Sequence, residues 1–270
     1  MTTHPFDSAI ELEESDQGLL GRTVPEYANM VGPFGGATAA ALLRAVELHP
    51  GRAGDPVALT VNFAAPIADG EFRIDTTLAR ANRSNQHWMI SLHQDGNVMS
   101  TATAVFGIRR ETWSDAETQI PDVPSPESVD RTPGPEGVRF LQNYDLRFVA
   151  GSPPADGVAR PSSTTTLWVR HDPVRELDFS ALAALSDVFY PRIFLRRGGP
   201  VPAGTISMTV YFHVDGAELA RLGDDYVLAT ATGQQFARGY FDQTAQLWSR
   251  DGDLLVTSSQ VVYYKDSFGS

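Results

Sequence analysis

The chain repeats one pattern twice, an apolar helix followed by a series of strands, and this repetition constrains its fold more than any other feature. In the first half, an Ala- and Leu-rich stretch without breakers at residues 36–48 predicts a helix of about four turns. In the second half, residues 178–195 predict a helix that bends or ends near Pro191. Each half therefore contributes one apolar helix that must be covered by other elements.

Strand-like runs follow each predicted helix. They lie at 57–64, 71–79, 86–94 and 98–108 in the first half, and at 205–214, 226–236, 239–250 and 254–265 in the second. The last two runs of each half are joined by the same kind of hairpin signal, Asp95-Gly96-Asn97 and Asp251-Gly252-Asp253. We therefore expect mostly antiparallel strands in both halves.

An apolar helix wrapped by a curved antiparallel sheet is the hotdog architecture, so two copies predict an α+β tandem (double) hotdog. Each half would be one long helix wrapped by its own curved antiparallel sheet. A doubly wound α/β fold is disfavoured, because strands and helices do not alternate. A polar, Pro-rich stretch at 111–137 predicts a linker between an N-terminal domain at 1–110 and a C-terminal domain at 138–270.

Charge and composition exclude several classes of function. Asp and Glu number 33 against 21 Lys and Arg, which disfavours nucleic-acid binding. There is no Cys, so disulfides and thiol nucleophiles are excluded. The six His show no metal-ligand spacing, and we expect neither a metal nor a cofactor. Without an apolar run of about 18 residues or a signal peptide, the sequence predicts a cytoplasmic protein with no membrane span.

Four short segments resemble the TesB-like acyl-CoA thioesterase II family, and the resemblance covers nearly the whole chain. They are Phe34-Gly35-Gly36 before the Ala-rich helix, Leu185-Ser186-Asp187, Thr205-Ile206 followed by Tyr211-Phe212-His213, and Ser258-Ser259-Gln260. The resemblance implies a double hotdog that hydrolyses an acyl-CoA thioester. It also implies that Asp187, Thr205 and Gln260, here called the polar trio, orient and activate the attacking water. Ser207-Met208 departs from the Asp-His that is usual in the family.

The residues themselves are compatible with this chemistry. With no G-x-S-x-G motif and no Cys, direct attack by water is favoured over an acyl-enzyme. Apolar neighbours would desolvate Asp187 and raise its pKa, as a general base requires. Gln260 interrupts a Val-rich run, so its amide needs a specific partner, and the Thr205 hydroxyl could hold the water or the thioester oxygen. The alternatives are a solvent-facing Asp, an ordinary strand Thr and an outward-facing Gln.

Several residues are candidates for binding the substrate. Gly35 and Gly36 would let an oxyanion or part of coenzyme A approach a helix N-terminus, or would only permit a tight turn. Arg192 and Arg196, in the densest basic cluster, would serve the phosphates of coenzyme A, or would form a solvated helix end. Tyr211 would line the acyl channel.

We therefore expect a thioester hydrolase whose partner is its acyl-CoA substrate. A non-catalytic acyl-CoA- or lipid-binding hotdog protein is the main alternative, because of the departure at Ser207-Met208. A hydratase or dehydratase is disfavoured, because no His lies beside the helix that starts near Phe34. Sheet edges need covering, either by pairing of the two halves or in a homodimer formed through sheet or helix contacts.

Overall fold

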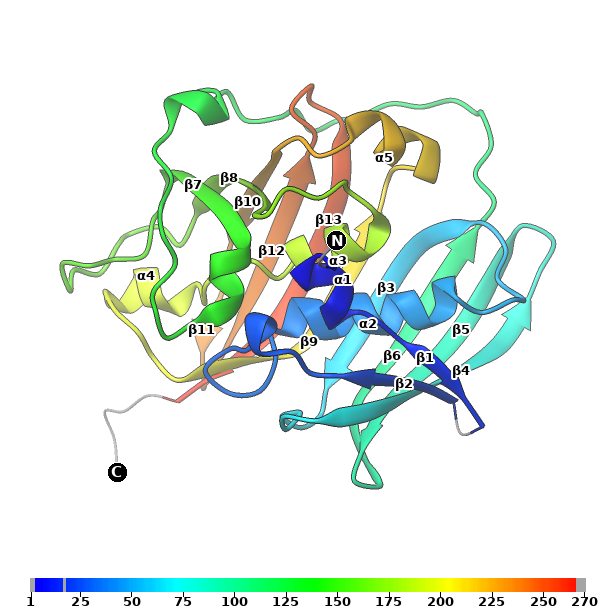
Figure 1. The fold of residues 1–270 in the computed structure, drawn as a ribbon. Coiled ribbons are helices and arrows are strands. Elements are labelled where there is room, and N and C mark those ends of the chain that lie inside the picture. The colour runs from blue at the N-terminus through cyan, green and yellow to red at the C-terminus, as the bar shows by residue number, and fades with distance from the viewer. Residues whose placement is uncertain (1–2, 17, 266–270) are drawn as a thin grey trace.

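The computed structural model describes residues 3–16 and 18–265, and within them all thirteen strands join in one antiparallel sheet (Figure 1). The elements of the first half are α1 (Pro5–Ala9), β1 (Glu13–Ser15), β2 (Gly18–Arg22), η1 (Pro25–Tyr27), α2 (Gly35–Glu47), β3 (Asp55–Phe63), β4 (Glu71–Ala81), β5 (Asn85–Gln94) and β6 (Asn97–Gly107). After η2 (Pro126–Ser128) and η3 (Arg139–Asn143), the second half contains β7 (Tyr144–Ala150), β8 (Thr165–His171), α3 (Phe179–Leu185), α4 (Ile193–Arg197), β9 (Ala203–Phe212), α5 (Gly216–Leu222), β10 (Val227–Thr232), β11 (Phe236–Ala237), β12 (Tyr240–Trp248) and β13 (Leu254–Tyr264).

The strand order of the second half mirrors that of the first. The sheet runs β1-β2-β4-β5-β6-β3-β9-β13-β12-β10-β8-β7, with β11 on the side of β12. The halves meet where β3 pairs antiparallel with β9, and there Thr60 lies opposite Thr209 with their hydroxyl oxygens 3.0 Å apart. This pairing covers one edge of each half with the other.

Helix α2 forms the centre of the core. Ala and Leu dominate it and favour a helix, and Leu42, Leu43 and Val46 are fully buried. Burial of each of these three side chains contributes about 1.5–3 kcal/mol. Helix α3 packs against α2, and Ser180 Oγ donates to the Ala40 carbonyl at 3.5 Å. Figure 1 shows the curved sheet around the two helices.

The helix predicted at 178–195, with a bend or an end near Pro191, is divided into two shorter helices. Asp178 caps α3, its carboxylate accepting from Ala181 N at 2.7 Å, but α3 ends at Leu185. Ser186 Oγ bonds back to the Leu182 carbonyl, and Pro191, which has no N–H, excludes a continuous helix. A second short helix, α4, begins at Ile193. Residues 186–192 therefore connect two helices.

The Pro-rich stretch expected as a linker lies on the sheet of the second half. Trp168 Nε1 donates to the Pro124 carbonyl at 2.9 Å, and Arg147 Nη1 donates to the Pro126 carbonyl at 2.8 Å. Arg250 forms an ion pair with Glu127 at 2.7 Å. Hydrogen bonds and an ion pair thus hold the crossing segment in place.

The strands before each helix, with α1 and α5, were absent from the sequence prediction. β1, β2, β7 and β8 supply the outer edges of the sheet, and the run predicted at 226–236 divides into β10 and β11. No helix in the described part of the chain is long and apolar enough to cross a membrane.

Candidate active site

Asp187, Thr205 and Gln260 meet at one end of α2. Asp187 lies just after α3, where its N–H donates to the Ala184 carbonyl at 3.0 Å. Thr205 is near the start of β9, and Gln260 is on the adjacent strand β13, opposite Met208. Because directly opposed residues of paired strands share a face, β13 directs the Gln260 amide toward the same side as Met208, where Asp187 lies.

The Gln260 side chain links the other two members of the trio. It is only 4% exposed, and its Nε2 donates to Asp187 Oδ1 at 2.9 Å and to the Ser186 carbonyl at 3.3 Å. Its Oε1 accepts from Thr205 Oγ1 at 3.0 Å. Because both its oxygen and its nitrogen are hydrogen-bonded, the amide fixes the positions of the carboxylate and the hydroxyl relative to each other. The outward-facing alternative for Gln260 does not hold.

The carboxyl group of Asp187 is poised to change its charge near neutrality. Burial raises its pKa to about 7, against which hydrogen bonds from Gln260 and the Gly36 N–H act to lower it. The residue keeps partial exposure, so water can reach it. A carboxylate with this pKa is suited to accept a proton at physiological pH.

Two glycines bring the N-terminus of α2 against Asp187. A Cβ on Gly35 would lie 2.8 Å from Asp187 Oδ2, and one on Gly36 would lie 2.6 Å from the Ala184 carbonyl oxygen. Any side chain at these positions would push the helix end away. The N–H groups of Gly35 and Gly36, the first two residues of α2, have no intrahelical partners, and that of Gly36 donates to the Asp187 carboxyl group.

The structure does not bring the other candidate binding residues to the trio. Arg192 is fully buried, and its Nη1 donates to the Ser163 carbonyl and to Thr165 Oγ1, which excludes it from contact with a solvent-borne phosphate. Arg196 lies on α4 and donates to the Pro161 carbonyl. Tyr211 is 49% exposed and three residues from Met208 on β9, so it lies on the opposite face of the sheet from Gln260.

Sequence profiles of two domains match nearly all of the chain. The profile described as acyl-CoA thioesterase N-terminal domain matches residues 24–107, and that described as acyl-CoA thioesterase C-terminal domain matches residues 119–264. The chain belongs to the acyl-CoA thioesterase family. The resemblance found in its four short segments is thereby confirmed.

Solved structures confirm the hotdog fold of this acyl-CoA thioesterase family member. A hotdog-fold protein of unknown function from Alicyclobacillus acidocaldarius is 47% identical, with a TM-score of 0.94 over 98% of this chain and 99% of that one. A tesB protein from Mycobacterium avium subs paratuberculosis is 21% identical, with a TM-score of 0.78 over 97% and 98% of the two chains. The acyl-CoA thioesterase II TesB2 of Mycobacterium marinum is 17% identical, with a TM-score of 0.75 over 98% and 100%. No curated protein matches the sequence.

The first half of this family member carries apolar residues where the second half carries the trio. The pair Gln260 and Met208 on β13 and β9 corresponds to Ala104 and Leu59 on β6 and β3. Asp187 lies nine residues after Asp178, the N-cap of α3. In the first half, the residue nine positions after Phe34, the N-cap of α2, is Leu43. A carboxylate and an amide are thus absent from the corresponding place, and the described residues hold a single trio.

Sequence reasoning missed a buried polar cluster next to the trio. Burial is the first cause that raises the pKa of Tyr144, and Tyr27 and the charge of Asp187 add to it. The Tyr144 ring lies 4.9 Å from that of His171. Neither ring nitrogen of His171 has a hydrogen-bond partner among the described residues. Burial, aided by the charges of Arg175 and His4, lowers the pKa of His171 to about 3. No local sequence signal marks this cluster, because its members come from segments far apart in the chain.

We expect His171 to make the fold sensitive to acid. The unfolded chain takes up a proton at this His below about pH 6.5, whereas the folded chain does not until about pH 3, so stability falls as the pH drops through this window. At pH 4.5 the loss amounts to about 3 kcal/mol. In urea denaturation at pH 8 and pH 4.5, His171→Phe should reduce the difference in unfolding free energy by about that amount. An equal difference in wild type and variant would contradict this prediction.

Proposed function

We propose that the protein hydrolyses fatty acyl-CoA thioesters by direct attack of water, with Asp187 as the general base. The observation that carries this proposal is the Gln260 amide, which joins the Asp187 carboxylate to the Thr205 hydroxyl at 2.9 and 3.0 Å. Membership of the acyl-CoA thioesterase family supports the substrate class. The products are a fatty acid and coenzyme A.

The proposed reaction needs three contributions from the chain. Asp187 accepts a proton from a water that also contacts Thr205 Oγ1, and the water oxygen forms a bond to the thioester carbon. The carbonyl oxygen becomes an oxyanion, which the Gly35 N–H at the start of α2 stabilises. When the carbon–sulfur bond breaks and the carbonyl of the fatty acid forms again, Asp187 gives its proton to the leaving thiolate, which regenerates the carboxylate for the next cycle.

We further propose that the chain is a tandem double hotdog in which only the second unit keeps the reactive side chains. The mirrored strand order and the pairing of β3 with β9 support two units at residues 1–110 and 138–270. The first unit contributes the N-terminus of α2. This arrangement explains why Gly35 and Asp187, from different halves, lie in contact.

The proposal is tested by measuring release of the coenzyme A thiol from acyl-CoAs with chains from C2 to C18. Turnover of at least one chain length supports hydrolysis, and the preferred length reports the depth of the acyl channel.

Met208 Sδ, 3.5 Å from Gln260 Nε2, places an apolar group where the family usually has His, which favours a second candidate, a non-catalytic acyl-CoA-binding protein. Binding of acyl-CoA without turnover would support that candidate.

The pH dependence gives an independent check on the base. The ionised carboxylate is the reactive form, so kcat/KM should rise about tenfold per pH unit below pH 7 and level off above it. Rates measured from pH 5 to pH 9 with one acyl-CoA, in buffers of constant ionic strength, provide the profile. A rate that is constant between pH 5 and pH 7 would contradict Asp187 as the base.

A further inference from the structure

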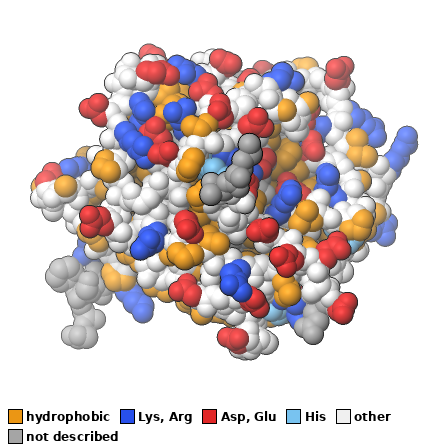
Figure 2. Space-filling view, viewed as in Figure 1, with side chains coloured by type: hydrophobic (Ala, Val, Ile, Leu, Met, Phe, Trp, Pro, Cys, Tyr) orange, Lys and Arg blue, Asp and Glu red, His pale blue; other side chains and the backbone are white. Residues whose placement is uncertain are grey.

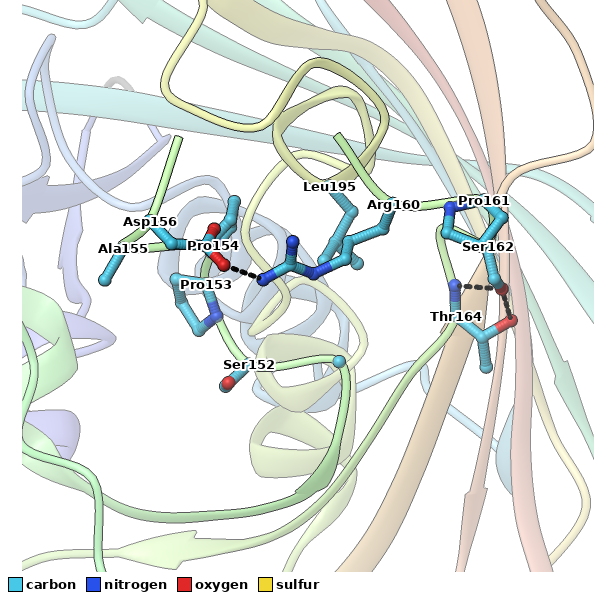
Figure 3. Close-up of a pocket in the computed structure, with 11 residues that line it drawn as sticks. Ser152, Pro153, Pro154, Ala155, Asp156, Arg160, Pro161, Ser162, Thr164 and Leu195 are labelled. Atoms are coloured by element: carbon cyan, nitrogen blue, oxygen red, sulfur yellow. Dashed lines mark hydrogen bonds and ion pairs between the residues drawn. The ribbon is translucent and has the colours of Figure 1, made fainter. Parts of the chain in front are cut away.

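A cavity of about 510 Å³ lies between residues 151–164 and helix α4 (Figure 3). Its walls include Pro153, Pro154, Asp156, Arg160 and Ser162, together with Leu195 of α4. No member of the polar trio lines it. The cavity is therefore a feature separate from the candidate active site.

The chain holds this cavity in a defined shape. Arg160 N donates to the Leu195 carbonyl at 2.7 Å, which joins the loop to α4. Gly198 ends α4 with a φ of 77°, and a Cβ there would lie 2.5 Å from the Gly157 carbonyl oxygen. A glycine is thus required for the loop to close on the helix end.

The cavity is connected to the segment that carries the general base. Tyr190 Oη donates to the carbonyl of Gly151, a residue of the cavity wall, at 2.7 Å. Tyr190 is only three residues after Asp187, a span of at most about 11 Å of chain. A short piece of chain therefore joins the base to the cavity wall, a separation that suits a substrate with a long flexible arm such as coenzyme A.

The charge at the cavity favours an anion. Arg160 lines it, and Arg196 donates to the carbonyl of Pro161, another wall residue, in a chain with a net charge of −12. Figure 2 shows acidic and basic side chains interspersed on the face of the molecule that it draws. Because the net charge is −12, the chain as a whole does not attract an anion, and local arginines must supply the attraction.

The carboxylate of Asp156 competes with an anionic ligand for the positive charge of Arg160. In Figure 3 the Arg160 guanidinium points to Asp156, and the two form an ion pair at 2.7 Å. Their side chains are 37% and 53% exposed, so the pair contributes little and an incoming phosphate can replace it. The ring faces of Pro153, Pro154 and Pro161 add apolar surface, and the Ser162 and Thr164 hydroxyls add polar groups.

We propose that this cavity binds the nucleotide end of coenzyme A, with Arg160 and Arg196 contacting its phosphates and the proline faces its adenine. The inference rests on the proposed function and adds the place at which the nucleotide end of the coenzyme A substrate is held. It also replaces the sequence expectation for Arg192, which is buried away from the cavity, by Arg160.

The test compares an acyl-CoA with the acyl-pantetheine of the same chain length, which lacks both nucleotide and phosphates. Arg160→Ala should raise KM for the acyl-CoA at least tenfold, leave kcat within twofold, and leave both constants for the acyl-pantetheine unchanged. Asp156→Asn should lower KM for the acyl-CoA severalfold, because it frees Arg160. Arg52→Ala, which removes an exposed arginine bonded to the Gly54 carbonyl in the first half, is the matched control and should change neither constant.

Calorimetric binding of free coenzyme A separates this inference from the proposed function, because it needs no turnover. Binding by wild type that is weakened at least tenfold by Arg160→Ala supports the cavity even if no thioester is hydrolysed. The cavity assignment is overturned if Arg160→Ala leaves the coenzyme A affinity unchanged, or if it raises KM equally for the acyl-CoA and the acyl-pantetheine.

Discussion

Replacing Asp187 with Asn is expected to lower kcat by about a hundredfold to ten-thousandfold, the range that a positioned general base contributes. The Asn oxygen can still accept the Gln260 hydrogen bond, so the geometry of the trio is retained while the proton acceptor is lost. Steady-state release of coenzyme A thiol at pH 8 measures the effect. Normal turnover by the variant would remove Asp187 from the mechanism.

The same variant should be more stable than wild type, and only at high pH. Because the folded state raises the pKa of Asp187 to about 7, ionisation disfavours folding as the pH rises from about 4 to 7. Asn has no charge, so at pH 8 the free energy of unfolding should increase by up to about 4 kcal/mol, and at pH 4 it should change by less than about 1 kcal/mol. Such a gain with loss of activity is typical of residues kept for function.

Glu47→Gln is the matched control for Asp187→Asn. Glu47 is a second carboxyl group beside α2 and α3 whose pKa is raised, with burial as the first cause, but it lies at the opposite end of α2 and accepts from Ser180 Oγ at 3.3 Å. We expect its replacement to leave kcat and the pH profile of kcat/KM unchanged. A comparable fall in kcat would show that loss of any buried carboxylate here disturbs the protein. The effect of Asp187→Asn would then no longer identify Asp187 as the general base.

Replacing Gln260 with Leu is expected to lower kcat by about a hundredfold and to move the acid limb of the pH profile to higher pH. The amide lowers the pKa of Asp187 through its hydrogen bond, so its loss should raise that pKa further above 7. It also frees Thr205 from its partner, so the hydroxyl no longer holds the water in place. The shift of the profile separates this effect from a general loss of folded protein.

Gln94→Leu provides the corresponding control. Gln94 is another buried strand amide with several hydrogen bonds, accepting from Ala68 N at 2.7 Å and donating to the Ala68 carbonyl at 2.9 Å, but it lies in the first half on β5. Its loss should reduce stability by about 1–3 kcal/mol, because buried groups lose their partners, and leave the pH profile in place. If both variants shift the profile equally, the Gln260 effect is structural.

The local pattern of the sequence was sufficient to predict most of the central elements. The Ala- and Leu-rich run became α2, and the hairpin signals at Asp95-Gly96-Asn97 and Asp251-Gly252-Asp253 lie between paired strands, because these features depend on neighbouring residues alone. The outer strands β1, β2, β7 and β8 were missed, because sheet edges owe their strands to pairing with distant segments more than to their own composition.

The second helix shows where local propensity was insufficient. Residues 178–195 are apolar enough for one helix, yet α3 ends at Leu185, Pro191 excludes a continuous helix, and Asp187 lies in the connecting segment. That position makes the carboxylate available to Gln260 and Gly36, whereas a helix would have directed it along its own surface. The division of the predicted helix and the formation of the candidate site have the same cause.

The sequence by itself determined the repeated pattern, the family and the identity of the three polar residues that meet. Only the tertiary structure decided that Gly35 of the first half closes on Asp187 of the second, that Arg192 is buried and that Tyr211 faces outward. These outcomes depend on the pairing of β3 with β9 and on the packing of α2 against α3. Contacts between segments so far apart in the chain are set by the burial of the whole core, which no local stretch of sequence specifies.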